Sequence, residues 1–265
     1  MLIRLLCIFY LLPMTVGSEE ASLERIYIAR EIITLDDAHP EATAVLVRSG
    51  RIAGIGAVEQ LQRNFPNAEL DRRFAEDVMV PGFIEHHVHP SLAAITMNAD
   101  VIAIEDWMLP GKMTLGVRDR GGYIDRLRTA EQNQPNANTP LITWGFHHYF
   151  HGKLTRQDLD AISSSRPILV IHRSFHEFIM NTPGLTYFGI TSEFVEGLDK
   201  EARQYASFDN GHFSEQGAVS ILPNVMQHLA ALNPLIAGLK KTEKYLHQNG
   251  VTLIANPGAM LLKSV

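Results

Sequence analysis

The sequence predicts an α/β protein in which a parallel sheet follows a small β unit. Apolar runs that suit buried strands lie at 78–84, 141–144, 167–171 and 250–254. Segments with the apolar spacing of helices alternate with them, at 123–131, 154–163, 221–232 and 235–248. Strands that are apolar throughout and alternate with helices are typical of a parallel sheet buried on both faces.

The first residues have the pattern of a secretory signal peptide. Arg4 precedes an apolar run at 5–12, and small residues follow Pro13. The run is too short to cross a bilayer, which takes about 20 apolar residues. We therefore predict a signal peptide over residues 1–18 and an exported protein, periplasmic or secreted; a buried first strand or helix is the alternative. The single cysteine, Cys7, lies in this segment, so a metal in the mature chain must be held by His, carboxylate or modified Lys.

Residues 19–78 are predicted to form the small β unit. The segments 24–35 and 43–47 are rich in Ile and Val, and Ser49-Gly50 is a turn before a third strand at 51–55. A short helix is expected at 58–64. The region with alternating strands and helices then covers residues 79–265.

Composition narrows the range of partners. The formal net charge is -6, and no basic cluster exceeds Lys240-Lys241, so nothing in the chain indicates nucleic-acid binding. We expect a small-molecule substrate and no membrane association once the signal peptide is removed. The composition leaves open whether the protein forms a homo-oligomer.

Two histidines lie where a metal site is expected. His87 and His89 follow an apolar strand and are two residues apart, so both side chains project to the same side. In a barrel of parallel strands, the C-terminal strand ends carry the active site. Imidazole ligands suit Zn²⁺, Fe²⁺, Mn²⁺ and Co²⁺ alike. For so short a pattern, two surface or core histidines without a ligand are the alternative.

The run around this pair resembles the first metal-binding motif of the amidohydrolase superfamily. It reads Pro81-Gly82-Phe83-Ile84-Glu85-His86-His87-Val88-His89, with Glu85 where Asp is commoner. Further blocks are similar to the amidohydrolase-3, or YtcJ-like, branch of that superfamily: 154–160, 167–170, 173–176 with Asn181, and 250–252. Residues 26–56 resemble the small β-sandwich that flanks the barrel in the same branch.

The resemblance implies a partial TIM-like (β/α) barrel of the metal-dependent hydrolase type with a small flanking β-sandwich. It also implies one or two divalent ions, Zn²⁺ first and Fe²⁺ or Mn²⁺ as alternatives, that activate water. The bond attacked would be a C–N bond in a non-peptide amide, a cyclic amide or an N-substituted formamide. Barrel metal hydrolysis of phosphoesters or esters and a catalytically inert truncated chain are the alternatives.

The remaining ligands and the acid/base Asp of such enzymes come from later strands, and we find none of them in this chain. A complete barrel takes about 250 residues. We therefore expect the chain to hold roughly the first half of a barrel, with the acid/base Asp beyond Val265 and little turnover of its own.

Other polar residues are candidates for binding. His176 and Asn181 match family positions that we assign to substrate binding. The alternatives are a histidine bonded to a backbone carbonyl and an asparagine that caps a helix. A histidine cluster follows the strand at 141–144, and we expect these loop histidines to be solvated rather than ligating: His147, His148 and His151.

Overall fold

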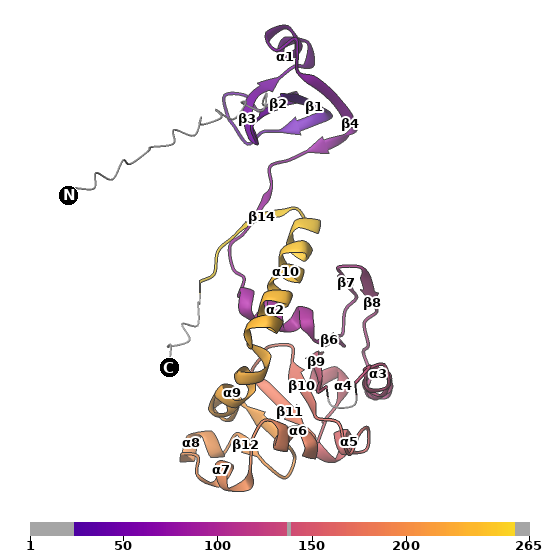
Figure 1. Cartoon of the computed structure of the whole chain (residues 1–265), viewed down its shortest axis with the longest axis vertical. Coiled ribbons are helices and arrows are strands. Elements are labelled where there is room, and N and C mark those ends of the chain that lie inside the picture. The colour runs from indigo at the N-terminus through magenta and orange to yellow at the C-terminus, as the bar shows by residue number, and fades with distance from the viewer. Residues whose placement is uncertain (1–23, 137–138, 258–265) are drawn as a thin grey trace, which may run out of the picture. The chain divides into compact units, whose positions relative to one another are not determined.

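The computed structural model describes residues 24–136 and 139–257, and the chain divides into two units, Met1–Gly82 and Phe83–Val265 (Figure 1). The signal peptide predicted over residues 1–18 lies outside the described residues. Among the helices of the described ranges, none has the length and apolar character needed to cross a membrane.

The first unit is a four-stranded sheet with one helix, in the strand order β3-β2-β1-β4. Its elements are β1 (Arg25–Ile33), β2 (Glu41–Arg48), β3 (Arg51–Gly56), α1 (Val58–Asn64) and β4 (Glu69–Met79). The turn between β2 and β3 has positive φ at Ser49 and Gly50, 51° and 72°, as two-residue hairpin turns that match strand twist require. The three strands and the helix predicted between residues 24 and 64 are confirmed.

Apolar side chains cover both faces of this sheet. On one face Ile26 and Leu46 pack with Leu61 of α1, and on the other Ile32 packs with Val45. The described part of the unit holds a single sheet with one helix, so the sandwich stays a prediction.

The strand predicted at 78–84 is wrong as one element. β4 ends at Met79 in the first unit, and β5 (Phe83–Glu85) begins the second. Pro81 lies between them and has no N–H to donate to a ladder, so the apolar run breaks there.

The second unit is built on a six-stranded sheet in the order β12-β13-β11-β10-β9-β6. These strands are β6 (Asp100–Val101), β9 (Leu141–Phe146), β10 (Ile168–His172), β11 (Glu177–Met180), β12 (Ala206–Ser207) and β13 (His212–Ser214). β6, β9 and β10 are parallel, whereas β11, β13 and β12 continue the sheet antiparallel. The prediction of a parallel sheet is therefore correct for half of it. The loop 173–176 is too short for a parallel crossover, which takes a dozen or more residues, so β11 must turn back on β10.

The second unit also contains helices. The longer ones are α2 (Pro90–Asn98), α3 (Arg120–Gln132), α9 (Glu215–Leu229) and α10 (Leu232–Gln248). The shorter ones are α4 (His148–His151), α5 (Arg156–Asp160), α6 (Thr182–Tyr187), α7 (Ser192–Glu196) and α8 (Lys200–Arg203). Thr155 and Asp158 form a capping box at the start of α5, with the Thr side chain and the Asp carboxylate each bonded to the other's backbone N–H.

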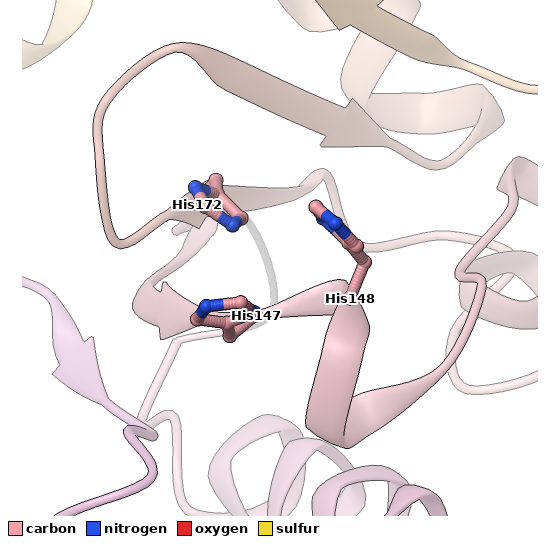
Figure 2. Close-up of side chains that lie close together, drawn as sticks. All are labelled: His147, His148 and His172. Carbon is pink, nitrogen blue, oxygen red and sulfur yellow. The ribbon is translucent and has the colours of Figure 1, made fainter.

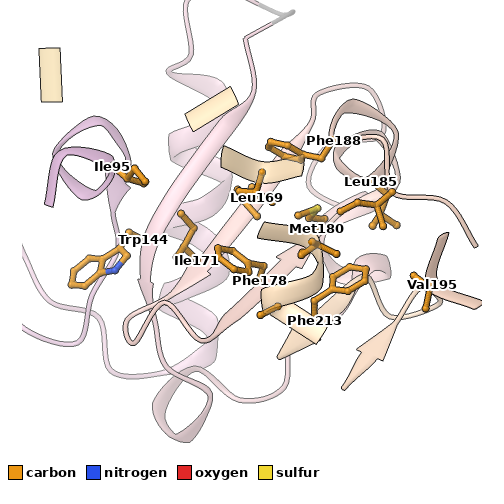
Figure 3. Close-up of a cluster of buried hydrophobic side chains, with 14 of the residues drawn as sticks. Ile95, Trp144, Leu169, Ile171, Phe178, Met180, Leu185, Phe188, Val195 and Phe213 are labelled. Carbon is orange, nitrogen blue, oxygen red and sulfur yellow. The ribbon is translucent and has the colours of Figure 1, made fainter. Parts of the chain in front are cut away.

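Alternate residues of β10 enter two hydrophobic cores. Leu169 and Ile171 belong to the core shown in Figure 3, to which α2 and α9 contribute. Ile168 and Val170 belong to the core on the other face, to which α3 and α5 contribute. All four side chains have no exposed surface. The apolar run is thus buried on both faces, as predicted.

Two further pairs of strands lie outside the large sheet. β7 (Trp107–Leu109) and β8 (Lys112–Thr114) form a hairpin, and β14 (Val251–Ile254) pairs in parallel with β5. Of the four barrel strands predicted, two lie in the six-stranded sheet and two pair only with each other. The described residues therefore form a mixed α/β unit with no closed barrel.

Candidate metal centre

His87 and His89 lie on the turn that leaves β5. Their ring centroids are 5.3 Å apart and the rings meet edge to face at 87°. Glu85, the last residue of β5, accepts a hydrogen bond from the backbone N–H of His87 at 2.9 Å, which fixes the turn. The two imidazoles are thus close neighbours at a strand end, where the sequence places the metal site.

The segment after β14 holds this turn from the other side. Val88 N–H donates to the carbonyl of Ala255, and Ala255 N–H donates to the carbonyl of Glu85, at 3.1 and 2.8 Å. His89 Nδ1 lies 3.3 Å from Asn256 Oδ1, which leaves Nε2 available to a ligand. Asn256 is a contact that sequence reasoning missed, because it comes from a segment distant in the chain.

The pair fits two positions of a metal centre. In the part of the chain that the structure describes, no third His, Cys or carboxylate comes within ligating reach of both rings. A transition ion bound by three or four protein or water ligands is the usual arrangement for catalysis. His87 and His89 therefore supply part of a donor set.

His89 also borders a pocket of about 440 Å³. The pocket has mostly apolar walls from α2 and α9, together with Phe175, His176 and Glu215. His176 is exposed, and its Nδ1 lies 3.4 Å from a Glu215 carboxylate oxygen. The size and apolar lining suit a small organic molecule. His176, predicted to bind substrate, and His89, predicted to bind metal, thus line the same pocket.

Asn181 has a structural role. Its Oδ1 accepts the N–H groups of Ile168 and Gly184, both at 2.8 Å, the second as the N-cap of α6. Its Nδ2 donates to the carbonyls of Ser163 and Arg166, both at 2.8 Å. The side chain has no exposed surface. Since every side-chain polar atom is bonded to backbone, the helix-capping alternative describes this residue, and substrate binding does not.

The histidines after β9 have different environments. His151 is buried, with Nε2 2.8 Å from the Val117 carbonyl and Nδ1 accepting the His147 N–H. Burial lowers the pKa of His151, which is consistent with a neutral ring. The expectation of a solvated residue is wrong for His151, because α4 turns it into the core. His148 is exposed as expected, and His147 is partly buried.

His147 and His148 meet a third histidine that the sequence did not single out. One nitrogen of each of His147, His148 and His172 lies within 4.8 Å of one nitrogen of each of the others. Figure 2 shows the three rings around one space, with His172 from the end of β10 and the other two from the start of α4. A histidine at the end of a predicted strand was the available signal, since the apolar run 167–171 stops next to His172.

Burial favours the neutral form of two rings of this cluster, His147 and His172. Burial lowers the pKa of His172 to about 4, and burial followed by the charge of His148 lowers the pKa of His147. Glu177 lies beside the cluster, next to His148. The main cause of the lowered pKa of Glu177 is its hydrogen bond with His212. Neutral imidazole is the form that binds metal ions.

No protein-family model matches the chain. Its fold is shared with uncharacterized metal-dependent hydrolases from Pyrococcus horikoshii OT3 and Pyrococcus furiosus, with TM-scores of 0.61 and 0.60 at 15% identity. The alignments cover 88% and 87% of this chain and 42% and 43% of those chains. The described fold is therefore a portion of the fold of that class of enzyme.

Two curated proteins are similar in sequence. The exoenzymes regulatory protein AepA of Pectobacterium carotovorum subsp. carotovorum is 25% identical over 258 residues, 94% of this chain and 53% of its own length. The N-substituted formamide deformylase of Arthrobacter pascens is 28% identical over 181 residues, 62% of this chain and 29% of its own. The chain thus spans about half the length of the first relative and less than a third of the length of the second. With the structural neighbours, these similarities are consistent with an amidohydrolase-like superfamily.

Proposed function

We propose that the protein is a metal-dependent hydrolase of C–N bonds in non-peptide amides, with N-substituted formamides as the first substrates to test. The observation that carries the proposal is the paired imidazoles of His87 and His89 at the end of β5. The fold shared with metal-dependent hydrolases and the similarity to a formamide deformylase support it.

Each residue of the turn has a task in this proposal. His87 and His89 hold a divalent ion, which when bound supplies an activated water and polarises the substrate carbonyl. Asn256 orients the His89 ring, and Glu85 holds the turn through the His87 N–H. Partners of this kind are commonly worth 10- to 100-fold in metal affinity.

The pocket beside His89 supports a substrate with an apolar substituent. Side chains of α2 and α9 provide a wall that excludes water, while His176 and Glu215 provide polar groups for orientation. An N-substituted formamide combines a small polar amide with a larger apolar group, and so matches this combination.

The test is formate release from an N-substituted formamide by the 265-residue chain loaded separately with Zn²⁺, Fe²⁺ or Mn²⁺. High protein concentration and long incubation are needed, because two ligands make a weak site. The variant His87→Ala with His89→Ala should lose about 100-fold or more of the rate, since a bound metal lowers the barrier by several kcal/mol. The exposed neighbour His86 provides the matched control, and His86→Ala should keep the rate.

Parallel assays with a carboxylic ester and a phosphoester identify the bond attacked. Preferential hydrolysis of either would replace the C–N assignment and keep the metal site. Equal rates for the wild-type chain and the double variant would contradict the role of the pair. Absence of hydrolysis in every assay would contradict the proposal for this chain and direct attention to its similarity with a regulatory protein.

A further inference from the structure

We propose that His147, His148 and His172 form a second metal site, separate from His87 and His89, which takes a divalent first-row transition ion such as Zn²⁺ or Co²⁺. The inference does not depend on the proposed hydrolase activity. In the described residues, this is the one group of three or more His, Cys, Asp or Glu side chains whose potential ligand atoms lie this close together.

The first argument is that the sheet itself assembles the cluster. β9 and β10 are parallel neighbours, and His172 pairs with Phe146, the residue before His147. Their C-terminal ends therefore meet at one edge of the sheet, where sites in α/β proteins are usually built. His148 begins α4 directly after this edge. His172 ends β10, and His147 and His148 follow β9 directly, so paired strands position the backbone of all three residues.

The second argument is an unpartnered buried nitrogen. His172 is 7% exposed, and its Nε2 has no hydrogen-bond partner. Its Nδ1 lies 2.7 Å from Ser174 Oγ and accepts the Ser174 backbone N–H at 3.2 Å. A metal bond at Nε2 needs the tautomer with the proton on Nδ1, which donates to Ser174 Oγ in place of the backbone bond. A buried polar atom without a partner costs free energy, on the order of 1–3 kcal/mol. A metal bond at Nε2 removes that cost.

The other two rings also have a contact at Nδ1. His148 Nδ1 lies 3.5 Å from Glu177 Oε1, an arrangement in which a carboxylate orients a metal-binding imidazole. His147 Nδ1 accepts the N–H of Tyr149 at 3.3 Å. That bond is long, so exchanging it for a metal bond at Nε2 costs little.

Geometry and charge both suit a tetrahedral ion. Zn–N bonds of about 2.0–2.1 Å place nitrogen ligands about 3.4 Å apart, so the observed limit of 4.8 Å requires a contraction of at most about 1.4 Å. The exposed His148 ring is free to supply this movement. Glu177 adds a negative charge beside the cluster, and solvent beside His148 gives a fourth ligand position access to water.

The experiment is a titration of the metal-free 265-residue chain with Co²⁺, followed by visible absorption, which distinguishes four-coordinate nitrogen ligation from hydrated Co²⁺. The variant His87→Ala with His89→Ala is the background, so that only the proposed site remains. It should bind one Co²⁺ per chain in four-coordinate form, and Zn²⁺ should displace it. In that background, His148→Ala should weaken binding about 100-fold or more, because even outer partners of ligands are worth 10- to 100-fold.

His147→Ala in the same background is the second variant, and His86→Ala is the control that removes an exposed histidine outside both groups. Circular dichroism verifies folding of each. Failure of the background variant to bind Co²⁺, or unchanged affinity after both His148→Ala and His147→Ala, would overturn the proposal. Loss in these two variants with full binding in His86→Ala would support it.

Discussion

The two histidine groups of the second unit are built in opposite ways. His87 and His89 come from one turn after a short strand, and a two-stranded pairing with β14 supports them. His147 and His172 come from two strands of the central sheet, and His172 is nearly inaccessible to solvent. The first group is a local motif on the surface, whereas the second is a product of strand pairing inside the framework.

This difference has a physical consequence. Removing an exposed side chain leaves the surrounding packing almost unchanged, so substitutions in the pair should alter ligand binding and little else. His172 ends β10, whose residues enter two hydrophobic cores, and its ring centroid lies 6.2 Å from that of the core residue Phe146. The integrity of the cluster and the stability of the second unit should therefore change together. The following predictions test this contrast in order of decreasing effect.

Gly145→Ala should damage the cluster most. Gly145 has φ of 113°, and a Cβ there would lie 2.8 Å from the Ile102 carbonyl oxygen. Strain and clash together should lower the free energy of unfolding by about 3 kcal/mol or more, measured by urea denaturation. Gly50→Ala is the control, since Gly50 has φ of 72° with nothing within 4 Å and should lose only about 1 kcal/mol. An equal loss of unfolding free energy in the two variants would show that a Cβ at Gly145 in β9 meets no clash.

Acid should lower the stability of the second unit by protonating His172. Its pKa falls from 6.5 to about 4 on folding. Between these values the unfolded chain binds a proton that the folded chain does not, so the free energy of unfolding rises with pH across this window. The contribution is fully present above pH 6.5 and lost by about pH 4. We expect an effect on the order of 3 kcal/mol, measured by denaturation in the presence of a chelator.

His172→Gln should flatten this pH dependence, because glutamine does not titrate. The double variant of His87 and His89 should retain it. A slope that persists in His172→Gln would assign the effect to other groups.

The smallest effects should come from the residues that orient each group. Asn256→Ala should weaken metal binding at the His87 pair about tenfold and leave the cluster unchanged, since Asn256 contacts His89. Ser174→Ala should weaken metal binding at the three-histidine cluster about tenfold and leave the His87 pair unchanged, because Ser174 Oγ contacts His172 Nδ1. Isothermal titration with Zn²⁺ measures both. Weakening at both sites by either variant would mean that the two groups are coupled.

Local features were predictable because neighbouring residues determine them. The turn at Ser49-Gly50 and the capping box of Thr155 and Asp158 each form from a few consecutive residues, and the turn occurs as predicted. The proximity of His87 and His89 follows from the i, i+2 spacing after a strand. The same reasoning failed at Pro81, where an apolar run continued past a break between two units.

What only the tertiary structure decided is which distant segments pair. The contact between Asn256 and His89 depends on β14 lying beside β5, and the meeting of His147 with His172 depends on the register of β9 and β10. Apolar strands carry little information about their neighbours, because any of them satisfies the same backbone hydrogen bonds and buries similar surface. By itself, therefore, the sequence determined the local elements and the histidine pair, while packing of the whole sheet determined the three-histidine cluster.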